Sequence, residues 1–202
     1  MNKNRIKKLS ILANTKFLSL YDAEYEKKNG KIGHWAISSR KDINTLNAQC
    51  FEGKEERTDA AIIAAFHEEE NKIVCIKQFR VPLNDYIYEL PAGLIDGEEK
   101  FEESAARELR EETGLKLISI NHEKTRARIY ASPGMTDESA AMVFCTCTGT
   151  ISDAYLEEEE DIEVLLLSRE EVKELLKRDV KIDIKAYMVF QTFMEIGEKL
   201  FK

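Results

Sequence analysis

Residues 93–115 read GLIDGEEKFEESAARELREETGL, a dense run of carboxylates that opens on Gly93 and closes on Gly114-Leu115. Apolar or small side chains recur every four residues between positions 101 and 113, which predicts a helix with one inward face. Gly114 follows at the place where a left-handed cap residue is favoured. The segment therefore predicts a helix that stops sharply at its glycine.

Carboxylates repeat along this helix at spacings that bring them together. Glu108 and Glu112 are four residues apart and point the same way, and Glu111 stands four residues from Arg107, an ion-pair spacing. A solvated acidic face is the ordinary explanation of such a charge run. The alternative is a divalent cation, because clustered carboxylates that leave room for water and phosphate oxygens suit Mg²⁺.

Composition limits the classes of partner. The chain has 202 residues, of which 43% are hydrophobic and 34% charged, so it can form one large domain or a core domain with a small appendage. A formal net charge of -8 argues against nucleic acid as the main partner, but a bound metal would still allow a small phosphorylated ligand. No apolar run approaches the ~20 residues of a membrane helix, and the basic N-terminus is too interrupted for a secretory signal. We expect a cytoplasmic protein without a membrane partner.

The rest of the chain alternates between strand and helix patterns. Strand patterns flank the central helix, at residues 17–25, 33–40, 59–67, 72–81, 86–90, 115–131, 139–150 and 161–167. Ser168 and Glu171 have capping-box spacing, and a last helix is expected after Asp183. This order predicts a mixed α/β or α+β domain over residues 57–202, preceded by a β-rich segment over residues 1–56.

The acidic segment resembles, at every defined position, the signature of the Nudix hydrolases: Gly93, Glu99, Arg107-Glu108-Leu109, Glu111-Glu112 and Gly114-Leu115. The resemblance implies the Nudix fold, in which a mixed sheet packs between helices as an α/β/α sandwich. It also implies hydrolysis of a nucleoside diphosphate linked to another group, with Mg²⁺ as cofactor and Mn²⁺ as a substitute. By position, Glu108 and Glu112 would be the main metal ligands, with Glu111 and the carbonyl of Ala92 contributing.

Catalytic roles follow from the same resemblance. Arg107 would pair with carboxylates such as Glu99 and hold them in place. Because the glutamates of the helix bind metal, the attacking water needs another carboxylate or direct activation by metal. The related enzymes use a glutamate on a loop before the last core strand. Here that loop is YLEEEEDIEV (155–164), which leaves Glu158 and Glu160 as alternative bases, with a solvated charge run as the other explanation.

The flanks of the segment resemble the ADP-sugar pyrophosphatase branch. QFRVPLNDYIYELPAGLIDGEE (78–99) is similar to its Q-[FY]-R-x-P and E-[LF]-P-A-G elements, and ASPGMTDE (131–138) is similar to its S-P-G segment, with Pro133 in a substrate-binding place. The resemblance implies that Arg80 contacts the pyrophosphate or the terminal ribose, as a guanidinium fork suits phosphate oxygens. The alternative is a surface arginine beside a strand. Glu89 would meet substrate or metal.

GHWAISSRK (33–41) resembles the W-x-x-x-x-R segment of the same branch. This implies that Trp35 stacks on adenine, often from the neighbouring subunit of a domain-swapped homodimer, with Arg40 nearby. A core or interface tryptophan is the alternative. The expected activity is Mg²⁺-dependent cleavage of ADP-ribose to AMP and ribose 5-phosphate. Another substrate, such as GDP-mannose or a dinucleotide, and a ligand-sensing Nudix domain without catalysis remain as alternatives.

Overall fold

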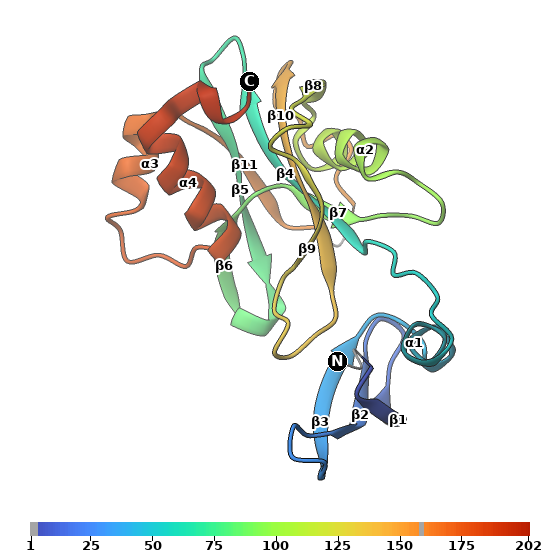
Figure 1. Ribbon diagram of the computed structural model, residues 1–202. Coiled ribbons are helices and arrows are strands. Elements are labelled where there is room, and N and C mark those ends of the chain that lie inside the picture. The colour runs from blue at the N-terminus through green and yellow to red at the C-terminus, as the bar shows by residue number, and fades with distance from the viewer. Residues whose placement is uncertain (1–3, 158–159) are drawn as a thin grey trace. The chain divides into compact units, whose positions relative to one another are not determined.

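The structure is a computed structural model that describes residues 4–157 and 160–202. The chain forms two compact units (Figure 1): one of residues 1–59 and 130–139, the other of residues 60–129 and 140–202. We call them the N-terminal unit and the sheet unit. The division into a segment of residues 1–56 and a domain of residues 57–202 stays a prediction. Within the described part of the chain, each helix is too short or too polar to cross a bilayer.

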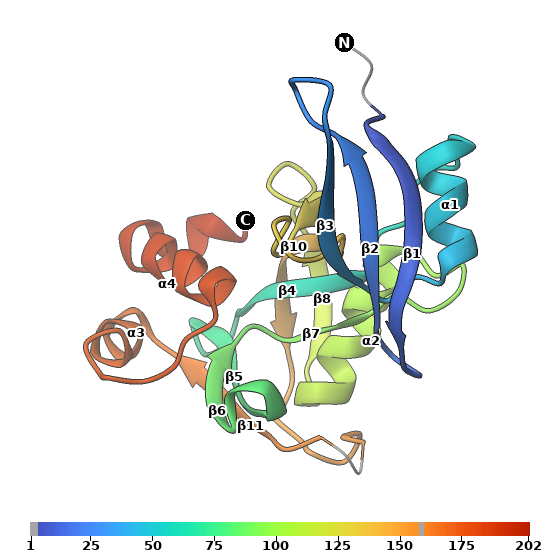
Figure 2. The same cartoon turned by 90° about the horizontal axis from the view of Figure 1, so that it is seen from below.

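The N-terminal unit is a three-stranded antiparallel sheet with one helix. The strands are β1 (Ile6–Asn14), β2 (Ser19–Glu26) and β3 (Ile32–Ser39), and α1 (Ile43–Phe51) lies against β1 (Figure 2). Leu9, Tyr21, Ala23 and Leu46 form its buried core. Asp42 caps α1, its carboxylate accepting hydrogen bonds from the N–H groups of the second and third helical residues.

The strand patterns did not predict β1 or α1. The helix sequence INTLNAQCF contains β-branched and amide side chains with weak helix propensity, so its signal is poor. The information was nevertheless present. Asp42 is a favoured N-cap residue, and Ile43, Leu46 and Cys50 recur at helical spacing on the side that packs into the core.

The sheet unit contains a mixed eight-stranded sheet. Along its main path the order is β11 (Ile162–Leu167), β5 (Lys72–Arg80), β4 (Ala60–His67), β10 (Ser139–Thr148) and β8 (Lys116–Ile120). Off this path, β6 (Asp85–Glu89) pairs with β5, β7 (Ala92–Leu94) with β4, and β9 (Arg126–Tyr130) with β10. β4 and β10 are parallel, whereas β5 is antiparallel to β4, β6 and β11. β4 is buried along nearly its whole length, which explains its continuous apolar sequence AAIIAAF.

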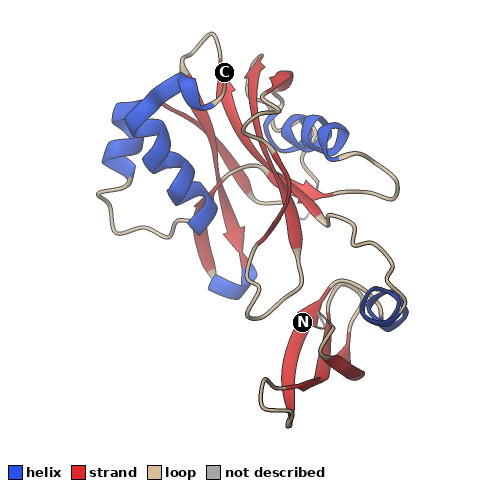
Figure 3. Cartoon of the chain, in the orientation of Figure 1, coloured by secondary structure: helices blue, strands red, loops and turns tan. Residues whose placement is uncertain are grey.

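Helices cover both faces of this sheet (Figure 3). α2 (Phe101–Thr113) buries Ala105 and Leu109 against one face, and α3 (Arg169–Leu175) and α4 (Ile184–Ile196) cover the other, where Phe190 and Phe193 are buried. The capping box of α3 and the start of α4 after Asp183 are as predicted. The expected α/β/α sandwich with a mixed sheet is therefore confirmed.

Candidate active site

α2 has the predicted bounds and is fixed at its C-terminal end. Gly114 adopts φ +74°, a left-handed conformation that glycine enters without penalty. A Cβ at this position would also lie 2.7 Å from the backbone nitrogen of Ser152. A side chain is thus excluded both by the dihedral angle and by space, so the helix ends at this residue.

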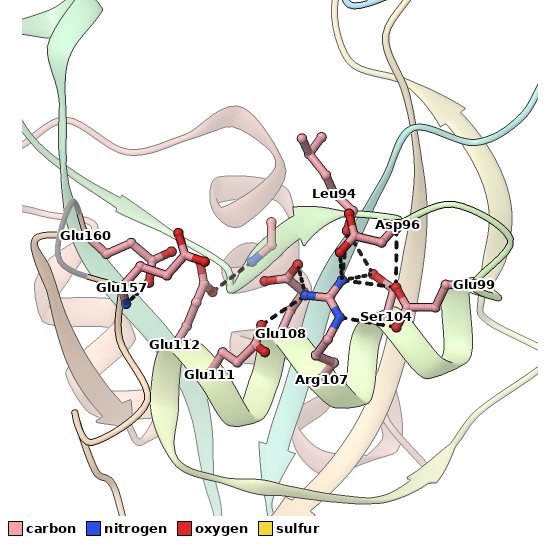
Figure 4. Close-up of polar contacts among 11 residues, drawn as sticks. Leu94, Asp96, Glu99, Ser104, Arg107, Glu108, Glu111, Glu112, Glu157 and Glu160 are labelled. Carbon is pink, nitrogen blue, oxygen red and sulfur yellow. Dashed lines mark hydrogen bonds and ion pairs between the residues drawn. The ribbon is translucent and has the colours of Figure 1, made fainter. Parts of the chain in front are cut away.

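Arg107 is the centre of the polar contacts on α2 (Figure 4). Its Nη2 and Nε donate to the carboxylate of Glu99 at 3.0 and 3.2 Å, and its Nη1 donates to Glu108 at 2.7 Å and to Glu111 at 2.9 Å. Nη2 also donates to the carbonyl of Leu94 at 2.9 Å. The hydrogen bond from Arg107 lowers the pKa of Glu99, so that this carboxylate remains ionised. We call Glu99, Arg107, Glu108, Glu111 and Glu112 the carboxylate site.

Glu112 is the deepest member of the carboxylate site, with 3% of its surface exposed. One of its oxygens accepts a hydrogen bond from the backbone N–H of Ala92 at 3.0 Å. Burial raises the pKa of Glu112 well above its usual value, and the charges of Glu108 and Glu160 raise it further. Burial likewise raises the pKa of Glu108. The site therefore holds negative charge at a cost that a cation would remove.

Gly93 allows β7 to pass directly over Glu108. A Cβ at residue 93 would lie 1.9 Å from the carboxyl carbon of Glu108, so any side chain there would displace the carboxylate. The reason for this glycine is space rather than a left-handed backbone. Gly93 lies in β7, which pairs with β4, so the sheet sets the position of this strand over Glu108.

The chemistry of the carboxylate site fits a hard divalent cation, because carboxylate oxygens are ligands that such ions prefer. In residues 4–157 and 160–202, however, no three His, Cys, Asp or Glu side chains are arranged as they stand to hold a metal ion. Arg107 draws Glu108 and Glu111 toward itself, and Glu112 is bonded to the backbone of Ala92. The three predicted glutamate ligands thus share one side of α2, but their oxygens point to Arg107 and to the backbone N–H of Ala92.

Glu160 lies beside the carboxylate site, and Glu158, the other candidate base, is outside the described residues. An oxygen of Glu160 accepts a hydrogen bond from the N–H of Glu157 at 3.0 Å. Figure 4 shows Glu160 beside Glu112, and its charge raises the pKa of both Glu108 and Glu112. The sequence could not show this approach, since it depends on the pairing of β11 with β5.

Arg80 and Glu89 form a bidentate ion pair between neighbouring strands. Nη2 of Arg80 donates to Glu89 at 2.6 Å, and Nε lies 3.1 and 3.2 Å from the two oxygens of that carboxylate. Burial acts to lower the pKa of Arg80, but the hydrogen bond to Glu89 and the charges of Glu89 and Glu112 raise this pKa above its ordinary value. The sequence predicted both residues as contacts of a ligand but not their pairing, which runs diagonally across the β5–β6 hairpin, because the register sets Arg80 opposite Asp85 and Glu89 opposite Ile76.

The remaining predicted contacts lie in the N-terminal unit. Trp35 is 53% exposed, which excludes a core role, and its Nε1 donates to the carbonyl of Gly134 at 3.1 Å. Nε of Arg40 donates to Glu138 at 2.7 Å, and Pro133 is exposed in the turn before Gly134. The role of Glu138 was missed, although it lies within the quoted ASPGMTDE segment.

Trp35 also lines a hollow of about 460 Å³ on the N-terminal sheet. Its other walls include Arg5, Tyr25 and Ile37. We call this hollow the aromatic hollow. It combines two aromatic rings with a guanidinium, a set of groups that suits a planar ligand.

Comparison with known proteins gives consistent matches. The NUDIX domain matches residues 56–190. An ADP-ribose pyrophosphatase of Bacillus subtilis is 30% identical over 189 residues, which cover 92% of this chain and 89% of that protein. A Nudix hydrolase of Schizosaccharomyces pombe is 31% identical over 145 residues, 70% of this chain, and the match spans 64% of that relative's length. The crystal structure of an ADP compounds hydrolase shares the fold, with a TM-score of 0.64 at 15% identity over 94% of this chain and 96% of that one.

Proposed function

The chain belongs to the Nudix hydrolase family, and on that premise we propose that it hydrolyses the pyrophosphate of ADP-ribose or of a related nucleoside diphosphate sugar. With ADP-ribose, the products are AMP and ribose 5-phosphate. The observation that carries the proposal is that the half-buried Glu108 and the buried Glu112 lie beside Glu160, which comes from the segment before β11. The likeness to an ADP-ribose pyrophosphatase over most of the chain supports the substrate.

Nudix hydrolases generally use divalent cations, and we assign Mg²⁺ to this one. Glu108 and Glu112 would hold it, with Glu111 and the carbonyl of Ala92, and Mn²⁺ would serve as a substitute. When bound, the cation supplies a Lewis acid that polarises a phosphoryl oxygen and makes a bound water more acidic. Arg107 keeps three carboxylates in place beside it.

Glu160 acts as the general base in this proposal. A water oxygen forms a bond to one phosphorus of the pyrophosphate while the bridging P–O bond breaks, and the water proton passes to the carboxylate of Glu160. The departing phosphate leaves with the bridging oxygen. Glu158 is the alternative base and lies outside the described residues. Either residue is separate from the carboxylates assigned to the metal.

Arg80 is assigned to the negative charge of the substrate. A guanidinium presents parallel N–H groups that match phosphate oxygens, and Glu89 fixes its orientation through the bidentate pair. Glu89 is thus a positioning residue for Arg80 in this proposal. The alternative, a surface arginine without function, predicts that Arg80→Lys leaves KM unchanged.

Trp35, Arg40 and Pro133 are assigned to recognition of the nucleoside. The exposed indole of Trp35 offers a stacking surface for adenine, and its hydrogen bond to the backbone fixes the ring. We also propose that the protein is a homodimer in which these residues act. The mass of the protein in solution, measured by light scattering, would contradict the dimer if it equalled that of one chain.

A substrate panel tests the proposed function. We expect ADP-ribose to give the highest kcat/KM among ADP-ribose, GDP-mannose, NADH and diadenosine polyphosphates in Mg²⁺, scored by released phosphomonoesters. AMP and ribose 5-phosphate should appear in equal amounts. If GDP-mannose or a dinucleotide were cleaved preferentially, the proposed substrate would be wrong, but hydrolysis of a pyrophosphate would still be the reaction. Binding of ADP-ribose without release of AMP would instead indicate a ligand-sensing domain.

A further inference from the structure

Residues 151–157 and 160–161, which we call the connecting segment, lie between β10 and β11 and contain no helix or strand. Glu160 lies near its end. The N–H of Ser152 donates to the carbonyl of Thr113 at 3.0 Å, which attaches the start of the segment to the last residue of α2. Glu160 itself lies two residues before Ile162, where the ladder between β11 and β5 begins, so side-chain contacts of the segment can add to the ladder in fixing its position.

Arg110 and Tyr155 make the first of these contacts. Nη2 of Arg110 donates to the hydroxyl of Tyr155 at 3.2 Å, and the guanidinium carbon lies 4.8 Å from the centre of the ring. A cation above an aromatic face is attracted by the ring quadrupole. Arg110 is not among the defined positions of the Nudix signature, although it lies on the same helix as Glu108 and Glu112.

Tyr86 and Asp161 make the second contact, at the other end of the connecting segment. The hydroxyl of Tyr86 donates to Asp161 at 2.5 Å, and the N–H of Phe79 donates to the carbonyl of Asp161 at 3.1 Å. The ring of Tyr86 is itself held by an edge contact with Phe79, with centroids 5.6 Å apart. This end of the segment is thus attached to β5 and β6.

Glu160 lies between the two attachments and faces the carboxylate site. Its backbone N–H donates to the carbonyl of Glu157 at 3.0 Å, and its side chain accepts from the N–H of Glu157 at the same distance. These local bonds fix the carboxylate relative to the segment but not relative to α2. That second relation is fixed by the attachments of the segment to α2, β5 and β6.

We propose that Arg110 and Tyr155 form a clamp that positions Glu160 over the carboxylate site, with Tyr86 and Asp161 as a second clamp at the other end. All four are positioning residues, since none of them is assigned to the substrate or metal. The inference rests on the proposed function in naming Glu160 as the base. Both members of the first clamp are solvent-exposed, so their contact adds little to the stability of the fold as a whole.

Kinetics of single variants give the first test, with ADP-ribose and saturating Mg²⁺. We expect Arg110→Ala to lower kcat about 10-fold with little change in KM, less than the roughly 10²- to 10⁴-fold expected for Glu160→Gln. Tyr155→Phe, which keeps the ring but loses the hydroxyl, should lower kcat less than Arg110→Ala. The matched control is Tyr187→Phe, since the Tyr187 hydroxyl also accepts an exposed hydrogen bond, from Gln191 at 3.0 Å, but on α4. An Arg110→Ala enzyme with the kcat of the control overturns the proposal.

A double-mutant cycle separates positioning of Glu160 from any other effect. If Arg110 acts through Glu160, then Arg110→Ala causes little further loss of kcat once Glu160→Gln is present. A full and independent 10-fold loss in that background would show that the clamp acts elsewhere and would overturn the inference. Tyr86→Phe is expected to behave in the same way as Arg110→Ala in the cycle.

Hydrogen exchange tests the clamp without any substrate. The N–H groups of Leu156 and Glu157 are hydrogen-bonded within the connecting segment, and we expect Arg110→Ala to speed their exchange at least several-fold while amides of β4 remain unchanged. Unchanged exchange overturns the clamp. If the wild-type protein failed to cleave ADP-ribose, the proposed function would be wrong, yet this measurement would still decide whether the clamp exists.

Discussion

On α2, Arg107 holds carboxylates that are its near neighbours in the chain, whereas Trp35 and Arg40 are held by Gly134 and Glu138, which are 99 and 98 residues away. The carboxylate site is thus local and partly buried. The contacts of Trp35 and Arg40 join distant segments and are exposed, and the aromatic hollow that Trp35 lines lies on the N-terminal sheet. The difference suggests a division of tasks in which the carboxylate site sets the rate of the chemistry and the N-terminal unit sets affinity for the nucleoside.

The largest effect should come from Glu112→Gln. This change keeps the shape and removes the charge assigned to metal binding, and we expect kcat to fall by about 10³-fold or more. Because burial raises the pKa of Glu112, the neutral amide should be no harder to bury than the carboxylate. The variant should therefore unfold at no lower temperature than the wild type in the presence of a chelator. Substantial residual turnover in Mg²⁺ would contradict the metal assignment.

Arg107→Lys should have the next largest effect. Lysine keeps the positive charge but loses the planar fork that reaches Glu99, Glu108 and Glu111 together. A partner that orients metal ligands is typically worth about 10- to 100-fold in activity or metal affinity, so we expect a loss of that size. Titration with Mg²⁺ should show a weaker apparent affinity. Arg178→Lys, an exposed change in the turn after α3, is the matched control and should behave as wild type.

Trp35→Ala tests the other half of the comparison. Loss of stacking on one base typically costs about 1–3 kcal/mol, so KM for ADP-ribose should rise roughly 10-fold or more while kcat changes little. The KM of Trp35→Phe should lie between that of the wild type and that of Trp35→Ala. If Trp35→Ala instead lowered kcat without raising KM, the N-terminal unit would contribute to the chemistry, and the division of tasks would be wrong.

The same contrast explains what the sequence could predict. The bounds of α2 were predictable from its helical spacing, and the pairing of Arg107 with Glu99 was predicted from the resemblance to the Nudix signature. Two features were not predicted: α1, whose residues have weak helix propensity, and the bidentate pairing of Arg80 with Glu89. That pair runs diagonally across the β5–β6 hairpin, where Arg80 is opposite Asp85 and Glu89 is opposite Ile76, and a single strand pattern does not predict such a contact. The sequence also could not predict contacts of backbone donors, such as the hydrogen bond from the N–H of Ala92 to Glu112, because every residue except proline has the same N–H group.

Lys41→Met should have the smallest effect on catalysis but the largest effect on the stability of the N-terminal unit. Nζ of Lys41 lies 3.0 Å from Asp59 and 2.8 Å from Asp137, and its side chain is 11% exposed. The second oxygen of Asp137 is buried and has no hydrogen-bond partner among the described residues. Removing the ammonium would leave two carboxylates uncompensated, which typically costs about 3 kcal/mol. Chemical denaturation followed by the fluorescence of Trp35 measures this cost.

The pH dependence of that cost gives the sharpest form of the test. Burial acts to lower the pKa of Lys41, but the hydrogen bonds that its ammonium donates to Asp137 and Asp59 outweigh burial and raise the pKa above 10.5. The folded state therefore binds the proton more tightly than the unfolded state. The stabilisation is complete below pH 10.5 and is lost as the pH rises through the raised value. The difference in unfolding free energy between wild type and Lys41→Met should be constant from about pH 7 to 9.5 and shrink above about pH 10.5. A difference that instead shrank between pH 7 and 9 would mean that Lys41 is not held as an ammonium by the two aspartates.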